Sequence, residues 1–450
     1  MIAIIGGGIS GLSLAYFLQK TNKPYMLLEE KNTFNGSILS IKEDKNLFEM
    51  GANSLLIDDF MTDFLEELGL SDEIIEANNV SKNRYIYKNK KINVLPSSPT
   101  DLVTNTFFSF YAKTRIFNEM RIKSKTNPNE TLSQFFERRF CKEIVDYGLS
   151  PFVSGIYAGN PDELLVRLTF PALVKMETEF GSIIKGFTKM SKTNNTGRKK
   201  TISFKNGIQT LTNAISEKVL HKKNNFKVEN LSKENQQENQ QNNQQNNQKF
   251  IIYSIDNEGN KQIIEADKIV LATPAYASNF LADLYADFHK SLQSINYAPM
   301  AVVHTTYKRV QVGDKLNGFG VLNPRVEGLF ALGSVWNSAI FVGRVPADEI
   351  LLTTFVGGTT GKANFSLSDE IILEKITKEN AEIYKIKGSP TSKRIFRWEK
   401  ALPQYDKNIL EALKISETLE NENVFVCSNW KGGVSIADCV LKGKELAEKL

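Results

Sequence analysis

Two residue types that build sites in many proteins are scarce in this sequence. Its 450 residues include only three cysteines, namely Cys141, Cys427 and Cys439. Three cysteines at this spacing suggest neither a disulfide framework nor a zinc knuckle, so we expect reduced thiols in a cytoplasmic protein. The histidines are His221, His289 and His304. They show no spacing typical of metal ligands, so the sequence predicts no metal site.

The sequence also lacks long runs of like charge and long runs of apolar residues. The net charge of +5 is mild, and no block of like charge indicates a nucleic-acid partner. No apolar run approaches the roughly 20 residues that a membrane-spanning helix needs. The first motif begins at residue 2, so we expect no targeting segment before it. With 41% apolar and 24% charged residues, the composition is that of a globular protein, and the length predicts two or three domains.

The first 30 residues have the pattern of a dinucleotide-binding unit. A strand at 2–5, a glycine turn, a helix to 19 and a strand at 25–28 follow one another. Gly6 allows the tight turn, Gly8 lets the backbone approach a pyrophosphate, and Gly11 lets helix and strand pack closely. An acid then falls where its carboxylate would accept hydrogen bonds from the hydroxyls of a ribose. The predicted contacts are Gly6, Gly8, Ile9, Ser10, Gly11, Glu29 and Glu30. The alternative is a glycine-rich turn in an ordinary α/β protein.

A low-complexity segment interrupts the middle of the chain. Residues 235–248 are all Asn or Gln except Glu238. Such a segment cannot bury apolar surface, so we expect a disordered loop over 234–249. It lies between two runs typical of strands, at 225–228 and 250–253, and we interpret it as an enlarged hairpin loop.

The C-terminal end returns to the nucleotide-binding pattern. A strand at 423–427 is followed by Gly432-Gly433 and a helix over about 435–449. This arrangement predicts one discontinuous domain that the chain leaves and re-enters. It favours FAD over NAD, because the N-terminus of the returning helix can lie at the flavin ring.

Five segments together carry a resemblance to a known family. They are Pro151–Leu164, Phe170–Gly186, Gly207–Leu211, Trp398–Tyr405 and Asn429–Ser435. In this order they resemble the FAD-dependent protoporphyrinogen and coproporphyrinogen oxidases of haem synthesis, within the flavin amine oxidase-like superfamily. Other amine oxidases share the nucleotide-binding ends but not the first two segments.

The resemblance implies an α/β fold with three parts. A discontinuous, Rossmann-like FAD-binding domain would take residues 1–80, 205–285 and 420–450. A substrate-binding domain with a mixed sheet would take 81–100 and 286–419, and a helical subdomain 101–204. Further implied FAD contacts are Gly51, Ala52, Asn53, Ser54, Val228, Gly433, Val434 and Ser435.

The resemblance also implies a reaction driven by the flavin, with no catalytic side chain. The implied substrate contacts are Asn53, Asn93 and Phe341, although taken alone Asn53 reads as a turn residue and Phe341 as a core aromatic. Asn93 stands where plant-type members have an arginine that pairs with a propionate, and substitution of that arginine by Lys90 and Lys91 is left open. We therefore favour protoporphyrinogen IX, which has two propionates, over coproporphyrinogen III, which has four carboxylates. Oxygen is the expected electron acceptor, and another acceptor is left open.

Several alternatives stay open. The chain has Thr33, Asn35 and Ser37 where such flavoenzymes have arginine, glycine and arginine, and Ile409 where they have histidine. These departures support an alternative hypothesis, in which the protein binds flavin or porphyrin without catalysis. A third hypothesis is that the protein is another FAD amine oxidase-like enzyme. A homodimer is also left open.

An aromatic segment has two interpretations. The residues Phe107, Phe108, Phe110 and Tyr111 lie close together, before Lys113 and Arg115. They fit either a core helix or a surface that touches the inner face of the cell membrane, where the helical subdomain would face the lipid.

Overall fold

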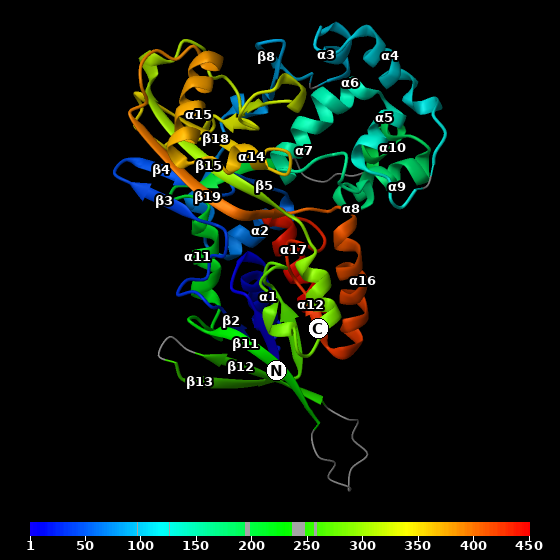
Figure 1. Cartoon of the computed structure of the whole chain (residues 1–450), viewed down its shortest axis with the longest axis vertical. Helices are drawn as coiled ribbons and strands as arrows, with labels where there is room; N and C mark the ends of the chain where they lie inside the picture. Colours follow the sequence, from blue (N-terminus) through cyan, green and yellow to red (C-terminus); the bar gives the residue numbers. More distant parts are fainter. Residues whose placement is uncertain (97, 126, 194–198, 236–247, 256–258) are drawn as a thin grey trace.

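The computed structural model describes residues 1–96, 98–125, 127–193, 199–235, 248–255 and 259–450. Figure 1 shows three regions: a nucleotide-binding region at the bottom, a sheet region at the upper left and a helical region at the upper right. Both chain termini lie in the lower region. The blue helix α1 and the red helix α17, from opposite ends of the chain, lie side by side there.

The lower region is built on a parallel five-stranded sheet. Its order is β10 (Lys222–Lys223), β2 (Tyr25–Leu28), β1 (Ile2–Ile5), β14 (Lys268–Leu271) and β20 (Val424–Val426). Around it pack the helices α1 (Ile9–Lys20), α11 (Gln209–Lys218) and α17 (Ile436–Lys449). Strands of a parallel sheet with both faces covered are apolar throughout, as β1 is, with every residue buried. The strands of this sheet come from parts of the sequence that lie far apart, between Ile2 and Val426.

A second, three-stranded sheet adjoins the first. Its strands are β11 (Lys227–Asn235), β12 (Gln248–Ile255) and β13 (Lys261–Ala266), all antiparallel. The pairing of β11 with β12 confirms the predicted hairpin. The predicted disordered loop lies outside the described residues over 236–247.

The upper left region is a mixed seven-stranded sheet. Its order is β19 (Ser392–Pro403), β15 (Tyr297–Lys308), β18 (Glu349–Gly357), β17 (Gly333–Val335), β16 (Gly320–Leu322), β7 (Tyr85–Lys88) and β8 (Lys91–Val94). Only the pair of β16 with β7 is parallel among these described strands. Helix α15 (Asp369–Tyr384) covers one face with Ile372, Ile376 and Tyr384.

The helical region holds the elements between β8 and β9 (Lys200–Phe204). Its main helices are α3 (Pro99–Thr104), α4 (Phe110–Asn118), α5 (Leu132–Arg139), α7 (Ser150–Tyr157), α9 (Pro171–Phe180) and α10 (Ile183–Thr193). A capping box opens α5, since Thr131 and Gln134 exchange hydrogen bonds between side chain and backbone. No helix in the described part of the chain is both long and apolar enough to cross a bilayer.

The aromatic segment divides between core and surface. Phe107 and Phe108 are 5% and 8% exposed and pack under the helical region, so the surface interpretation is wrong for these two rings. Phe110 and Tyr111, at the start of α4, are 84% and 63% exposed. The predicted α/β class is confirmed by the sheets and helices above, while the precise domain boundaries stay a prediction.

Candidate functional site

The glycine turn between β1 and α1 admits no side chain at two positions. Gly6 has φ +111°, and a Cβ there would lie 2.8 Å from the carbonyl carbon of Ala272. A Cβ on Gly11 would lie 1.9 Å from the Gly6 oxygen, so only glycine lets the helix meet the strand. Above Gly8 there is more room, since its nearest neighbour would be Gly36 Cα at 3.6 Å. This open approach is what a pyrophosphate needs.

The N-terminus of α1 suits an anion. Within this fully described helix, the first turn holds no acidic residue and no side chain caps it. The N–H groups of Ile9, Ser10 and Gly11 begin the helix, where the partial positive charge of its dipole is concentrated. The residues around this turn therefore fit the diphosphate of a dinucleotide.

Glu29 lies directly after β2, beside the glycine turn. Its carboxylate accepts hydrogen bonds from the N–H groups of Gly7 (2.6 Å) and Lys31 (3.0 Å). Its backbone carbonyl accepts from Phe226 N–H (2.9 Å), which brings the start of β11 and the half-buried Val228 close to the same place. Glu30 is exposed. A carboxylate fixed in this way keeps acceptor capacity for a ribose.

A second predicted loop, residues 50–54, is anchored from the large sheet. Trp398 donates its indole N–H to the Met50 carbonyl (2.7 Å). His304 contacts the Glu49 carbonyl through Nε2 (3.0 Å), and burial lowers its pKa to about 4, so the neutral ring donates this bond. The tryptophan of the segment Trp398–Tyr405 thus positions the loop that carries Gly51, Ala52, Asn53 and Ser54.

Asn53 is oriented by two residues that the sequence did not reveal. Asn337 donates its amide to the Asn53 carboxamide oxygen (2.6 Å), and Thr353 donates its hydroxyl to Asn337 (2.6 Å). Asn53 in turn donates to the Gly51 carbonyl (3.0 Å). One signal was present, because Thr353 and Thr354 interrupt the otherwise apolar strand β18. Buried polar residues in such a strand need polar partners.

The other two predicted substrate contacts lie elsewhere. Phe341 is 1% exposed and packs 5.2 Å from the Arg344 guanidinium, so a contact with substrate would require neighbouring side chains to move. Asn93 donates its amide to the carbonyls of Lys88 (3.1 Å) and Lys91 (2.9 Å), inside its own hairpin. Direct substrate contact by either residue stays a prediction.

The two lysines next to Asn93 line a separate cleft. This cleft has a volume of about 710 Å³ and is lined on one side by Lys90 and Lys91. On the other side it is lined by Lys375 and Lys378 of α15 and by Lys385, which follows that helix. None of the predicted FAD or substrate contacts lines this space. The cleft is therefore distinct from the glycine turn and from the residue 50–54 loop.

Hydrogen bonds from several side chains fix the N-terminal end of α17. Ser435 caps the helix through a capping box with Asp438, and Gly433 has φ +113°. The Gly433 N–H donates to the hydroxyl of Tyr405 (2.9 Å), which itself donates to the Asn429 carbonyl (2.8 Å). Tyr405 is 2% exposed, and burial raises the pKa of its phenol, so it stays a donor.

Three of the resembling segments meet at this point. Gln404 donates its amide to the Tyr157 carbonyl (2.9 Å) and Leu165 N–H donates to the Tyr405 carbonyl (2.9 Å). A Cβ on Gly159 would lie 2.6 Å from the Gln404 side-chain oxygen. The segments Pro151–Leu164 and Trp398–Tyr405 therefore pack together next to the loop that ends at Gly433.

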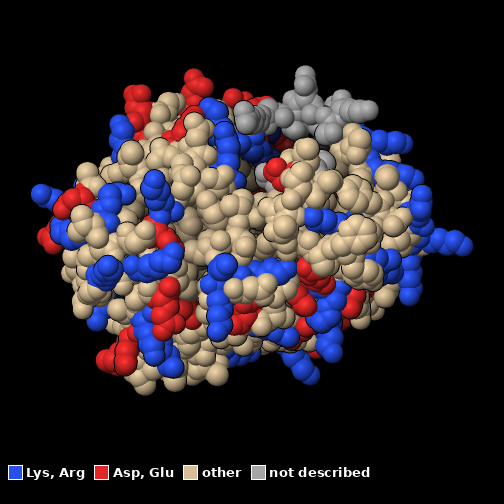
Figure 2. Space-filling view, turned by 90° about the horizontal axis from the view of Figure 1, so that it is seen from above, with Lys and Arg blue, Asp and Glu red and all other residues tan. Residues whose placement is uncertain are grey.

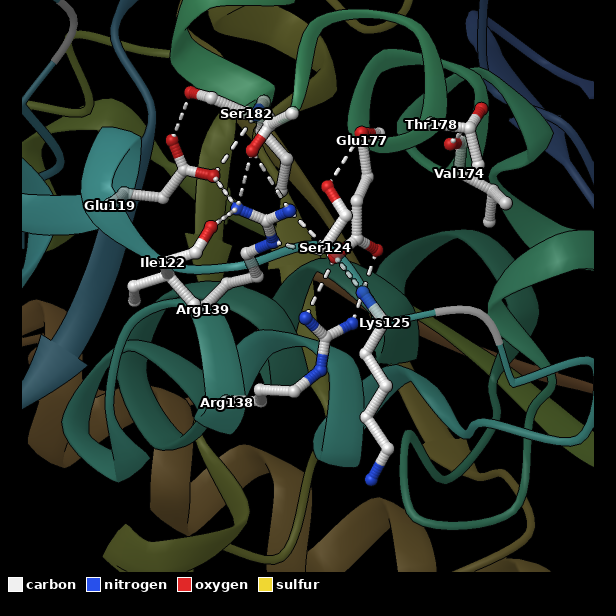
Figure 3. Close-up of polar contacts among 12 residues, drawn as sticks. Glu119, Ile122, Ser124, Lys125, Arg138, Arg139, Val174, Glu177, Thr178 and Ser182 are labelled. Atoms are coloured by element: carbon white, nitrogen blue, oxygen red, sulfur yellow. Dashed lines mark hydrogen bonds and ion pairs between the residues drawn. The ribbon is translucent and has the colours of Figure 1, made fainter.

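The segment Phe170–Gly186 has a structural role instead. Arg139 is fully buried and pairs with Glu119 (2.8 Å) and Glu177 (2.6 Å), as Figure 3 shows. Arg138 pairs with Glu177 as well (2.8 Å), and Ser182 donates its hydroxyl to Glu119. These residues, which we call the Arg139 cluster, tie α5, α9 and the start of α10 together.

Comparison with known proteins identifies the family of this chain. The family model described as flavin containing amine oxidoreductase matches residues 9–450. The chain belongs to this family. It is an FAD-dependent oxidoreductase, as the nucleotide motif and the resemblance predicted.

Several individual relatives of this chain are named as porphyrinogen oxidases. A mitochondrial protoporphyrinogen oxidase of Nicotiana tabacum is 30% identical, covering 99% of this chain and 94% of the relative. Protoporphyrinogen oxidase 2 of Arabidopsis thaliana is 29% identical (99% and 93%), and coproporphyrinogen III oxidase of Bacillus subtilis is 26% identical (98% and 96%). These names confirm the resemblance stated from the segments.

Solved structures confirm the fold. A chain from Exiguobacterium sp. 255-15 superposes with a TM-score of 0.78 at 20% identity, covering 100% of this chain and 98% of that one. A putrescine oxidase superposes with a TM-score of 0.69 at 16% identity, with coverage of 100% and 98%. The predicted FAD contacts are consistent with this fold, and their assignment residue by residue stays a prediction.

Proposed function

We propose that this protein oxidises protoporphyrinogen IX to protoporphyrin IX, with FAD as the hydride acceptor and oxygen as the final oxidant. The observation that carries the proposal is the junction of Tyr157, Gln404, Tyr405 and Gly433. Segments that resemble porphyrinogen oxidases, rather than flavin oxidases in general, are joined there to the end of α17. The relatives from tobacco and Arabidopsis support the same substrate class.

The chemistry suits a site without an acid–base pair. When bound, FAD supplies the two-electron acceptor for a hydride from an sp³ bridge of the porphyrinogen. A pyrrole nitrogen stabilises the positive charge left behind, and its proton goes to solvent. The protein then has to hold the macrocycle against the flavin and exclude water. Asn53, fixed by Asn337 and Thr353, provides an oriented amide at the loop that approaches the flavin.

The carboxylate count of the substrate favours protoporphyrinogen IX. A buried carboxylate without a cation or hydrogen-bond donors is costly, so a substrate with four needs more donors than one with two. Asn93 directs its amide into its own hairpin, and Lys90 and Lys91 line the cleft beside α15. These side chains therefore make their contacts away from Asn53. Fewer cations are then left near Asn53 to pair with the additional carboxylates of coproporphyrinogen III.

One experiment tests this choice. Purified protein loaded with FAD is given protoporphyrinogen IX and coproporphyrinogen III in parallel, and porphyrin fluorescence and oxygen uptake are recorded. The proposal expects both signals, with kcat/KM higher for protoporphyrinogen IX. A higher value for coproporphyrinogen III would reverse the specificity. FAD binding without oxidation of either compound beyond that in air alone would instead favour the flavin- or porphyrin-binding protein.

A membrane contact through the helical region accompanies this proposal, because porphyrinogens are poorly soluble. Val103, Phe110 and Tyr111 are 56%, 84% and 63% exposed. Lys113 donates to the Val103 carbonyl (3.0 Å), which places a cation at the backbone of this segment. Figure 2 looks down on this end of the molecule and shows broad uncharged areas bordered by Lys and Arg as well as by Asp and Glu. Exposed aromatic rings next to cations are typical of surfaces that bind anionic lipid. A homodimer stays a prediction.

A further inference from the structure

The ammonium group of Lys442 lies within a ring of backbone carbonyl oxygens at the N-terminal end of α17. It donates to the carbonyls of Ser428 (2.8 Å), Lys431 (2.6 Å) and Gly433 (3.0 Å). An ammonium group has three N–H donors, so these bonds use all of them. The backbone from 428 to 433, which we call the cofactor loop, is folded round this one side chain.

The position of Lys442 in the helix explains how it reaches the loop. Side chains of an α-helix point back toward its N-terminus, and Lys442 lies in the second turn of α17. Its half-buried stem runs along the loop, since a Cβ on Gly432 would lie 3.3 Å from the Lys442 Cδ. Leu441, one residue earlier, is 40% exposed and points elsewhere. The face of α17 that carries Lys442 is therefore directed at the loop.

The cofactor loop is held from two directions. Lys442 binds the Gly433 carbonyl, while Tyr405 accepts the Gly433 N–H (2.9 Å). Tyr405 also donates to the Asn429 carbonyl (2.8 Å), within the same loop. Both polar groups of the Gly433 backbone are therefore fixed, and with them the direction in which the chain enters Val434 and Ser435.

The charge of Lys442 balances that of Asp438 at the same helix end. The Asp438 carboxylate accepts from Ser435 N–H (3.2 Å). Burial raises the pKa of the nearby Cys427 thiol to about 12, and the Lys442 charge opposes this rise. The ammonium thus offsets the Asp438 carboxylate, so that the partial positive charge of the helix N-terminus is not outweighed there.

We propose that Lys442 is a positioning residue for the flavin ring: it fixes the cofactor loop and offsets the Asp438 charge where the ring binds. The proposal rests on the placement of FAD at Gly433–Ser435 under the proposed function. Without the ammonium, three carbonyls lose their donor and the loop loosens. The reduced ring carries more negative charge than the oxidised ring, so loss of the cation should lower the flavin potential.

The loop can be tested without cofactor. Hydrogen exchange is compared in the apo-forms of wild type, Lys442→Met and the control Lys444→Met, whose lysine lies on the same helix and is 41% exposed at its side chain. Lys442→Met should speed exchange of the Lys431 and Gly433 amides by about tenfold or more, with the amides of α1 unchanged. Lys444→Met should match wild type. Equal loop exchange in all three proteins would overturn the proposal, even if FAD binds elsewhere.

The charge is tested by the two-electron potential of the bound flavin. Lys442→Met should lower it by about 30 mV, which corresponds to a tenfold change in the relative affinities for reduced and oxidised cofactor. Lys442→Arg keeps the charge and should restore most of the potential, and Asp438→Asn should raise it. A potential that is the same in wild type, Lys442→Met and Asp438→Asn would overturn the electrostatic role. Failure of wild type to bind FAD would refute the proposed function but leave the exchange result intact.

Discussion

The Glu29 carboxylate accepts the N–H of Gly7 at 2.6 Å, so the acid after β2 and the glycine turn after β1 form one unit. The bond joins residues that are 22 positions apart. It fixes the carboxylate beside the N-terminus of α1, where we predict that the ribose and the diphosphate of FAD bind next to each other.

Replacing this acid should weaken FAD binding. Glu29→Ala removes a charge-assisted acceptor and is expected to cost about 1–3 kcal/mol of FAD binding free energy. Glu30→Ala serves as the comparison, because Glu30 is exposed and should contribute less. Titration of the apo-proteins with FAD, followed by flavin fluorescence, measures both. Equal affinity of Glu29→Ala and wild type would show that Glu29 does not bind the ribose.

How much of the site could be read from the sequence depends on how local its determinants are. The glycine turn and Glu29 lie within one strand–helix–strand unit, so spacing alone predicted them. The bond between Asn53 and Asn337 spans 284 positions and depends on how β18 faces the loop, which no local pattern encodes. No sequence pattern indicated Lys442 either, because its contacts with the cofactor loop form only when the loop folds back over α17.

The aromatic segment shows the same limit. Phe107 and Phe110 are three positions apart and chemically identical, yet they are 5% and 84% exposed. The difference arises because α4 begins at Phe110, while Phe107 packs beneath Lys88, whose ammonium donates to the Phe107 carbonyl (2.6 Å). Burial here is decided by a contact with a distant hairpin, not by the segment itself.

The Arg139 cluster should be essential for the stability of the helical region. Arg139→Met would leave the buried carboxylates of Glu119 and Glu177 without their shared cation, which costs about 3–5 kcal/mol. Urea denaturation, followed by circular dichroism, measures the loss. The matched control is Lys142→Met, which breaks an exposed pair with Asp146 and should cost about 0–1 kcal/mol. Similar denaturation curves for both variants would contradict the assigned role of the cluster.

Glu49 should make stability depend on pH. Burial raises the pKa of its carboxyl from 4.5 to about 7 in the folded protein. At this carboxyl the folded state therefore binds more protons than the unfolded chain between these values, so the contribution of Glu49 to the free energy of unfolding falls as pH rises through this window. Glu49→Gln cannot ionise and should lack this dependence, with a gain over wild type of up to about 3 kcal/mol above pH 7. Parallel denaturation from pH 5 to 8 tests this, and identical pH profiles would refute it.

The membrane contact should depend on two exposed rings. Phe110→Ser/Tyr111→Ser should reduce binding to anionic lipid vesicles roughly tenfold, because apolar surface no longer enters the interface. Val310→Ser is the control, since Val310 is 95% exposed and lies in the sheet region. Co-sedimentation with vesicles measures all three proteins. Pelleting of the double variant to the same extent as wild type would rule out this surface.

Hydride transfer from a porphyrinogen to the bound flavin is the central claim, and anaerobic reduction tests it most directly. Protoporphyrinogen IX is mixed with the FAD-loaded protein without oxygen, and the visible absorbance of the flavin is followed. The account predicts that the flavin bleaches as the substrate is oxidised, and that its colour returns when oxygen is admitted. A flavin that keeps its full absorbance with both protoporphyrinogen IX and coproporphyrinogen III would contradict the account.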